Sequence, residues 1–323
     1  MNTLFEQARE QHNSGQLDAA EELYRQHLDE VPDDFRAHCN LGCLLEAQGK
    51  LVEAQKCQMR ALDIKPDEYM PHYNLGHVLQ CQGRLEAAAG AYRRALELAP
   101  NFTAAHFNLG QVLYEQGQSE DALTSFRRAT ESGPDSFEAH AALGGTLFGL
   151  QRIDEAVVAY QRALELNPAA DEEQYLLGRM LEALGRFPEA ESAYRKTLEL
   201  NPVAVVAMEA LATILHKMDR REEAVEVLEQ WLQGMPGEPR AGHLLAALTG
   251  ESVPERADDS YVAAIFDQFS ADFDETLERL NYQGPQLVQQ ALTGVPWNWR
   301  RILWQRISTS RRFSTSRVDP RMP

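Results

Sequence analysis

The sequence predicts an all-α protein built as a solenoid of stacked helix–turn–helix units. Three observations predict this fold class: proline, alanine and a small residue each recur at a fixed place in a 34-residue period. A period of this length indicates one supersecondary unit that is copied along the chain, because each copy buries its apolar face against its neighbours. The prolines keep the period without a shift, at Pro32, Pro66, Pro100, Pro134, Pro168, Pro202 and Pro236.

The period divides residues 1–250 into seven copies and one further helix, 239–250, which we expect to cap the stack. The eighth place of every copy is glycine or alanine, and the twentieth is alanine in all seven. A small residue in each half of the copy indicates two helices that approach each other closely. The copies are 1–34, 35–68, 69–102, 103–136, 137–170, 171–204 and 205–238.

Within each copy, the elements follow from the spacing of a few residue types. Leucines at the seventh and eleventh places, such as Leu75 and Leu79, lie on one face of a helix. Glycines midway through the copy, such as Gly49 and Gly83, suit the left-handed residue that ends a first helix. The proline then ends the second helix, because it has no N–H group to continue the hydrogen bonding.

The pattern N-L-G-x-x-L-x-x-x-G-x-x-x-x-A, followed by A-L-x-L-x-P, resembles the tetratricopeptide repeat. The clearest copies read HYNLGHVLQCQGRLEAAAGAYRRALELAP and HFNLGQVLYEQGQSEDALTSFRRATESGP. The resemblance covers residues 1–238 and implies a right-handed superhelix that binds proteins or extended peptides. Stacked repeats form extended binding surfaces more often than active sites. We therefore expect a protein-interaction scaffold that is not an enzyme and needs no cofactor.

Composition narrows the partners and the compartment. The net charge is −18, with 49 acidic and 31 basic residues, so the repeat body is expected to repel nucleic acid and anionic membranes. The start of the chain has no secretory signal, and no apolar stretch is long enough to span a bilayer. Four cysteines in 323 residues are typical of reduced thiols, so we expect a cytoplasmic location.

The concave face of the stack, lined by the first helices, is the predicted binding surface. Its sixth place carries a ladder of amides, which can hydrogen bond to the backbone of an extended peptide, and aromatic side chains add apolar area. The ladder resembles that of O-GlcNAc transferases, although no glycosyltransferase sequence follows. The alternative is that each amide only bonds a neighbouring helix and keeps the stack in register. The predicted groove residues are Asn40, Asn74, Asn108, Tyr73, Phe107, Tyr114, Phe148 and Tyr175.

Two sets of residues suggest metal ligands. Histidines at the fourth place (His38, His72, His106, His140) lie one repeat apart, too far to share an ion, so we interpret them as core residues. Cys39, Cys43, His77 and Cys81 are a possible zinc set on two neighbouring helices. Cysteine is also a common small hydrophobic residue in helices, and we favour free thiols and no metal.

The composition changes after the repeats. Residues 251–260 form a polar linker, and 261–295 carry an apolar stripe that predicts an extra helical pair. Residues 250–295 resemble the entry segment of tetratricopeptide-containing, S-adenosylmethionine-dependent methyltransferases. That family continues into a strand and a D-x-G-x-G cofactor loop, which this sequence lacks. The alternative function is therefore the substrate-recruiting part of such an enzyme, truncated and inactive alone.

The tail, 296–323, is rich in arginine, tryptophan and serine and contains no glycine. Three interpretations stay open: a disordered tail, a basic binder of an anionic surface, and an out-of-frame ending that removes a catalytic core. We favour the last, with disorder as the physical state of the tail.

Overall fold

The computed structural model describes residues 3–250, and this part of the chain is entirely helical. The prediction of an all-α solenoid is confirmed. Odd-numbered helices up to α13 are the first helices of the repeats and even-numbered helices are the second. Their bounds are α1 (Leu4–Asn13), α2 (Leu17–Glu30), α3 (Phe35–Ala47), α4 (Leu51–Ile64), α5 (Tyr69–Cys81), α6 (Leu85–Leu98), α7 (Thr103–Glu115), α8 (Ser119–Ser132), α9 (Phe137–Gly149), α10 (Ile153–Leu166), α11 (Asp171–Ala183), α12 (Phe187–Leu200), α13 (Val205–Lys217), α14 (Arg221–Gly234) and α15 (Pro239–Thr249).

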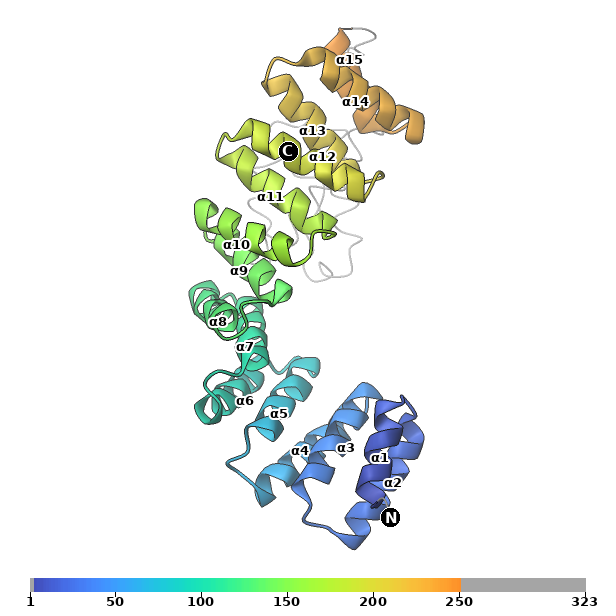
Figure 1. The fold of residues 1–323 in the computed structure, drawn as a ribbon, viewed down its shortest axis with the longest axis vertical. Helices are drawn as coiled ribbons and strands as arrows, with labels where there is room; N and C mark the ends of the chain where they lie inside the picture. Colours follow the sequence, from blue (N-terminus) through green and yellow to red (C-terminus); the bar gives the residue numbers. More distant parts are fainter. Residues whose placement is uncertain (1–2, 251–323) are drawn as a thin grey trace, which may run out of the picture. The chain divides into compact units, whose positions relative to one another are not determined.

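Each helix packs against the helices that precede and follow it, so the pairs stack in chain order (Figure 1). The first helices α1, α3, α5 and α7 also contact one another directly across the second helices between them. Direct contact between first helices is expected on the inner side of a curved stack. The side chains of the first helices therefore line the candidate binding face.

In repeats three to six, a close contact joins the glycine at the eighth place to an aromatic ring at the twenty-fourth. A Cβ atom added to Gly76 would lie 2.7 Å from the Tyr92 ring, and one added to Gly144 would lie 2.5 Å from Tyr160. Gly110 with Phe126 and Gly178 with Tyr194 repeat this geometry. The alanines of the twentieth place are fully buried in all seven copies, so both small residues are required by close packing.

The turns within the repeats take the left-handed backbone conformation predicted for their glycines. Gly49 has φ 75° and Gly83 has φ 71°. Copies five and seven use Gln151, with φ 60°, and Asp219, with φ 61°, at the equivalent turn. Asparagine and aspartate tolerate this conformation better than most residues, whereas a glutamine there is uncommon.

The fourth-place histidines are not core residues, which corrects our interpretation of the sequence. Their rings are half-buried, and each Nε2 forms a hydrogen bond with the carbonyl oxygen of the proline six residues earlier. The His38–Pro32 distance is 2.8 Å and the His106–Pro100 distance is 2.7 Å. These carbonyls lie beyond the end of a helix, where they need a partner from outside it. The histidines thus tie each turn between repeats to the next helix.

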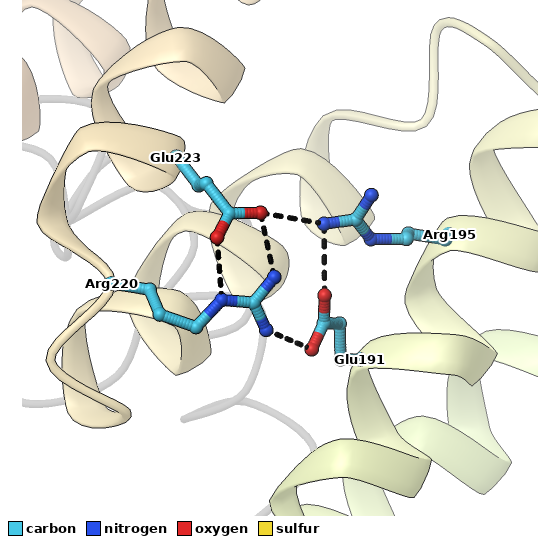
Figure 2. A network of polar contacts seen from close by, with 4 residues as sticks. All are labelled: Glu191, Arg195, Arg220 and Glu223. Atoms are coloured by element: carbon cyan, nitrogen blue, oxygen red, sulfur yellow. Dashed lines mark hydrogen bonds and ion pairs between the residues drawn. The ribbon is translucent and has the colours of Figure 1, made fainter.

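A ring of four charged side chains joins repeats six and seven on the second helices (Figure 2). Arg220 donates to both carboxylate oxygens of Glu223, at 2.6 Å each, and to Glu191 at 2.6 Å. Arg195 closes the ring with Glu191 at 2.8 Å and Glu223 at 3.4 Å. The two-pronged contact of Arg220 fixes the relative orientation of its guanidinium and the Glu223 carboxylate, and the network links α12 to the start of α14.

Two glycines in neighbouring helices provide a matched test of the close packing. Gly76→Ala should destabilise the protein by about 1–3 kcal/mol, because the new methyl group overlaps the Tyr92 ring. Gly90→Ala, on α6, meets no atom within 4 Å and should stabilise by up to about 1 kcal/mol through helix propensity. Urea denaturation followed by circular dichroism measures both. Equal shifts for the two variants would contradict the close contact.

The fully buried Ala88 tests whether stability is shared only between neighbouring repeats. Ala88→Leu adds three heavy atoms between α5 and α6, and we expect a loss of about 1–3 kcal/mol. Because each repeat is stabilised by its neighbours, faster hydrogen exchange should be concentrated in residues 35–136. Uniformly faster exchange across residues 3–250 would contradict a repeat array.

Candidate functional site

The sixth-place asparagines connect first helices of neighbouring repeats. Asn74 on α5 is only 6% exposed, and its Nδ2 donates to the Cys39 Sγ of α3 at 3.1 Å. Asn108 on α7 is half-buried and donates from Nδ2 to the hydroxyl of Tyr73 on α5, at 3.1 Å. The Tyr92 hydroxyl lies 3.5 Å from the same nitrogen. These contacts hold the orientation of the amides relative to the stack.

Asn40 on α3 occupies the same place one repeat earlier, beside the hydroxyl of Tyr24. Burial raises the pKa of Tyr24, and the neighbouring Asn40 side chain opposes this rise. All three amides of the ladder therefore lie next to a polar atom of the preceding repeat. The contacts of Asn74 and Asn108 are those expected if the ladder keeps the repeats in register.

The fifth-place aromatic rings pack between the first and second helices. Tyr73 packs against Tyr92 and Phe102, with ring centroids 5.7 and 4.8 Å apart. Phe107 packs on Phe126 at 5.9 Å. Tyr175 packs on Tyr194, also at 5.9 Å. Tyr73, Phe107 and Tyr175 are half-buried, so each ring still presents part of its surface to solvent.

The twelfth-place residues lie further along the first helices and differ in exposure. Tyr114 on α7 is 38% exposed, whereas Phe148 on α9 packs against the largest core cluster. A Cβ atom added to Gly149 would lie 3.9 Å from the Tyr114 hydroxyl, so α9 faces this tyrosine with a residue that has no side chain. A Cβ atom added to Gly145, one helical turn earlier, would lie 3.3 Å from the Tyr160 hydroxyl, so the open surface beside Tyr114 is at the exposed Gly149. Tyr114 thus borders a surface on which another polypeptide backbone can approach closely.

The predicted set of four zinc ligands is split between two environments. Cys39 is buried in the wall of α3, where Gln58 donates from Nε2 to its carbonyl oxygen at 3.0 Å. Gln58 also lies 3.8 Å from the Cys43 Sγ. A hydrogen bond between the two thiols lowers the pKa of Cys39 and raises that of Cys43. Cys39 and Cys43 are therefore part of the packing between α3 and α4.

His77 and Cys81 instead gather with Glu46 of α3, a residue that our sequence analysis missed. Each of these three side chains offers one atom that can bind a metal ion, and in the described part of the chain these atoms all lie within 4.8 Å of one another. The contact of the Glu46 carboxylate with His77 raises the pKa of that imidazole, and burial opposes the rise. Side chains 35 residues apart lie together on neighbouring first helices, as Cys39 and Asn74 do. Counting 35 residues back from Cys81 gives Glu46, so this spacing is the sequence signal that could have identified it.

Some predictions fall on residues outside the described part. They are the linker 251–260, the helical segment 261–295 and the tail 296–323. The segment 250–295 that resembles a methyltransferase entry also lies beyond the residues matched by the family models below, which end at residue 248. Within residues 3–250, no helix combines the length and apolar character needed to cross a membrane.

Comparison with solved structures relates this fold to other helical repeats. YrrB, described as a TPR protein with an unusual peptide-binding site, is 26% identical, with a TM-score of 0.53 over 58% of this chain and 96% of its own. The C-terminal part of a TPR repeat-containing protein from Cytophaga hutchinsonii is 15% identical, with a TM-score of 0.65 over 75% of this chain and 99% of its own. Pseudomonas aeruginosa pilF is 20% identical, with a TM-score of 0.52 over 66% of this chain and 97% of its own. The last two show the fold alone.

Family models match most of the described residues, whereas no curated protein matches the chain. Two tetratricopeptide-repeat models cover residues 5–68 with 109–171 and residues 183–248, and a TPR-repeat model covers 81–117. The matched segments fall within the seven copies and the following helix. The chain therefore belongs to the tetratricopeptide-repeat family.

Proposed function

We propose that this protein is a scaffold that binds an extended peptide segment of a partner protein along its first helices, in the region of Tyr114. The observation that carries the proposal is the exposed Tyr114 ring beside the exposed Gly149 of α9, which has no side chain. An aromatic anchor next to an open path for the peptide backbone suits a segment that lies flat on the helices. The likeness to YrrB, which is described as having an unusual peptide-binding site, supports this kind of ligand.

The asparagine contacts are compatible with binding. Tyr73 and Tyr92 hold the Nδ2 of Asn108, which fixes the plane of its amide before a ligand arrives. An amide held in this way can offer its oxygen to a peptide N–H group without losing further side-chain entropy. Asn74 is buried and bonded to Cys39, so its main contribution is to the stack. We therefore assign the peptide contact to Asn108.

The charge of the face argues for a segment that is not strongly acidic. Lys217, on the first helix α13, is paired with Glu182 at 2.7 Å. Arg179 lies beside Tyr175, with its Nη1 3.5 Å from the tyrosine hydroxyl. The chain as a whole has a net charge of −18, so long-range electrostatics attract basic partners and repel acidic ones. The free cysteines of the repeats suit a reducing compartment, and we propose the cytoplasm.

Tyr114→Ala tests the proposed anchor. Phage-displayed 12-residue peptides selected on the full-length protein provide the probe, and calorimetry with a synthetic copy gives its affinity. Loss of the ring should weaken binding at least tenfold, since burying a large apolar side chain contributes about 1.5–3 kcal/mol. Val158→Ala, on the second helix α10, removes a 64% exposed apolar side chain and should leave affinity unchanged. Equal affinity for both variants would place the peptide elsewhere.

The two asparagines separate binding from stability. Asn108→Ala should weaken the selected peptide by about three- to tenfold, the effect of losing one hydrogen bond. Asn74→Ala should lower the urea midpoint and leave the affinity of the folded protein close to wild type, because this amide is buried. Calorimetry and denaturation are measured on both variants. If Asn108→Ala lowered stability without changing affinity, the ladder would have only a structural role.

A further inference from the structure

Two repeats carry a glutamate at the twelfth place of the first helix, and their surroundings differ. In repeat six, Glu182 accepts a hydrogen bond from the Tyr194 hydroxyl at 2.8 Å. It also forms an ion pair with Lys217, on the first helix of repeat seven, at 2.7 Å. Lys217 follows Glu182 by 35 residues. A carboxylate at this place is therefore positioned to face a cation supplied by the next repeat.

Repeat two places Glu46 in the equivalent position, but the supporting residues are changed. The tyrosine of the twenty-fourth place is replaced by Gln58, which is fully buried and directed at the Cys39 carbonyl. The residue 35 positions after Glu46 is Cys81, where repeat seven has its lysine. His77 lies one helical turn before Cys81 on α5 and contacts the Glu46 carboxylate through Nδ1. Next to Glu182, the equivalent space is filled by the ammonium group of Lys217. Next to Glu46, this space is instead bordered by the Glu46 carboxylate, the His77 imidazole and the Cys81 thiol.

These three donors have the composition and the spacing of a transition-metal site. His77 and Cys81 are four residues apart on one helix, so their side chains share a face. The three donor atoms lie within 4.8 Å of one another. Ligands around a tetrahedral zinc lie about 3–4 Å apart, given bond lengths of about 2.0–2.3 Å. Cys81 is exposed, so rotation of its side chain can close the remaining distance.

We propose that Glu46, His77 and Cys81 bind a divalent transition-metal ion, best matched by Zn²⁺, between α3 and α5. Mixed oxygen, nitrogen and sulfur ligands favour zinc over magnesium or calcium, which prefer oxygen alone. Three protein ligands leave one coordination position for water. The side chain of Glu46 is 17% exposed and that of His77 45% exposed, so an ion reaches the site directly from solvent.

Binding exchanges protons for the metal. The Cys81 thiol loses its proton and coordinates as a thiolate, and the ion replaces the proton that lies between the His77 Nδ1 and the Glu46 carboxylate. The imidazole then coordinates in its neutral form. Metal uptake therefore releases protons to solvent, and affinity rises with pH.

Titration with Co²⁺ alone tests the proposal on the reduced, full-length protein. We expect one equivalent to bind and to produce a thiolate-to-cobalt charge-transfer band, which Zn²⁺ then removes by displacement. Zn²⁺ should also raise the melting temperature, because it binds the folded protein preferentially. Absence of the charge-transfer band, or a band that survives Cys81→Ser, would overturn the site.

Three variants distinguish this site from the other cysteines and from loss of fold. Glu46→Gln should weaken Zn²⁺ binding by more than about 100-fold, beyond the roughly 10- to 100-fold that the loss of a hydrogen-bond partner of a ligand usually costs. Cys43→Ser should bind as wild type does, since Cys43 is part of the packing between α3 and α4. If Cys43→Ser abolished binding, the ion would belong to a different ligand set.

Cys81→Lys copies the arrangement of repeat seven and controls for folding. The new ammonium group should pair with Glu46 as Lys217 pairs with Glu182, so the metal-free melting temperature should be maintained. Binding of Co²⁺ and the stabilisation by Zn²⁺ should both disappear. A variant that is folded and still binds Co²⁺ with a thiolate band would contradict the assignment of Cys81.

Discussion

The contact between a glycine and an aromatic ring inside the helical hairpins of repeats three to six is the constraint on which the rest of the structure depends. It sets the distance between first and second helices. The Tyr92 ring, for example, occupies the space that a Cβ atom at position 76 would need. Because the distance between the two helices is similar from hairpin to hairpin, the interface between neighbouring hairpins is also similar along the chain. Because neighbouring hairpins stack in the same way, side chains of one repeat contact those of the next at a constant spacing in the sequence.

That register explains why residues 35 positions apart recur as contacts between first helices. Asn74 meets Cys39, Asn108 meets Tyr73, and Lys217 meets Glu182. The extra residue beyond the 34-residue period reflects the offset between packed helices. The binding face is therefore a set of equivalent positions whose chemistry changes from one repeat to the next. Its function depends on these changes more than on the shared scaffold.

The solenoid could be predicted from the sequence because its constraints are local and repeated. Proline, glycine and alanine mark the helix ends and the close contacts, and each signal appears several times. The site was harder to predict, since its contacts join side chains whose directions depend on the packing. Glu46 belongs to a different helix from His77 and Cys81, and no motif within one helix connects them. The role of the histidines at the turns was missed because an aromatic ring at a packing position resembles a core residue, while its hydrogen bond is with a carbonyl beyond the helix end.

Repeat two is the place where the chain departs most from its own pattern in the interior. Gln58 replaces the ring at the twenty-fourth place, and its Oε1 is buried without a hydrogen-bond partner. An unpaired buried oxygen is costly, so a ring would be the more stable choice for packing alone. The replacement also removes the tyrosine hydroxyl that satisfies the equivalent glutamate of repeat six. The glutamine at this place therefore makes the packing less stable and also leaves the Glu46 carboxylate without a tyrosine partner. Glu46 contacts His77 and Cys81 instead, and a site for an external cation requires such a carboxylate.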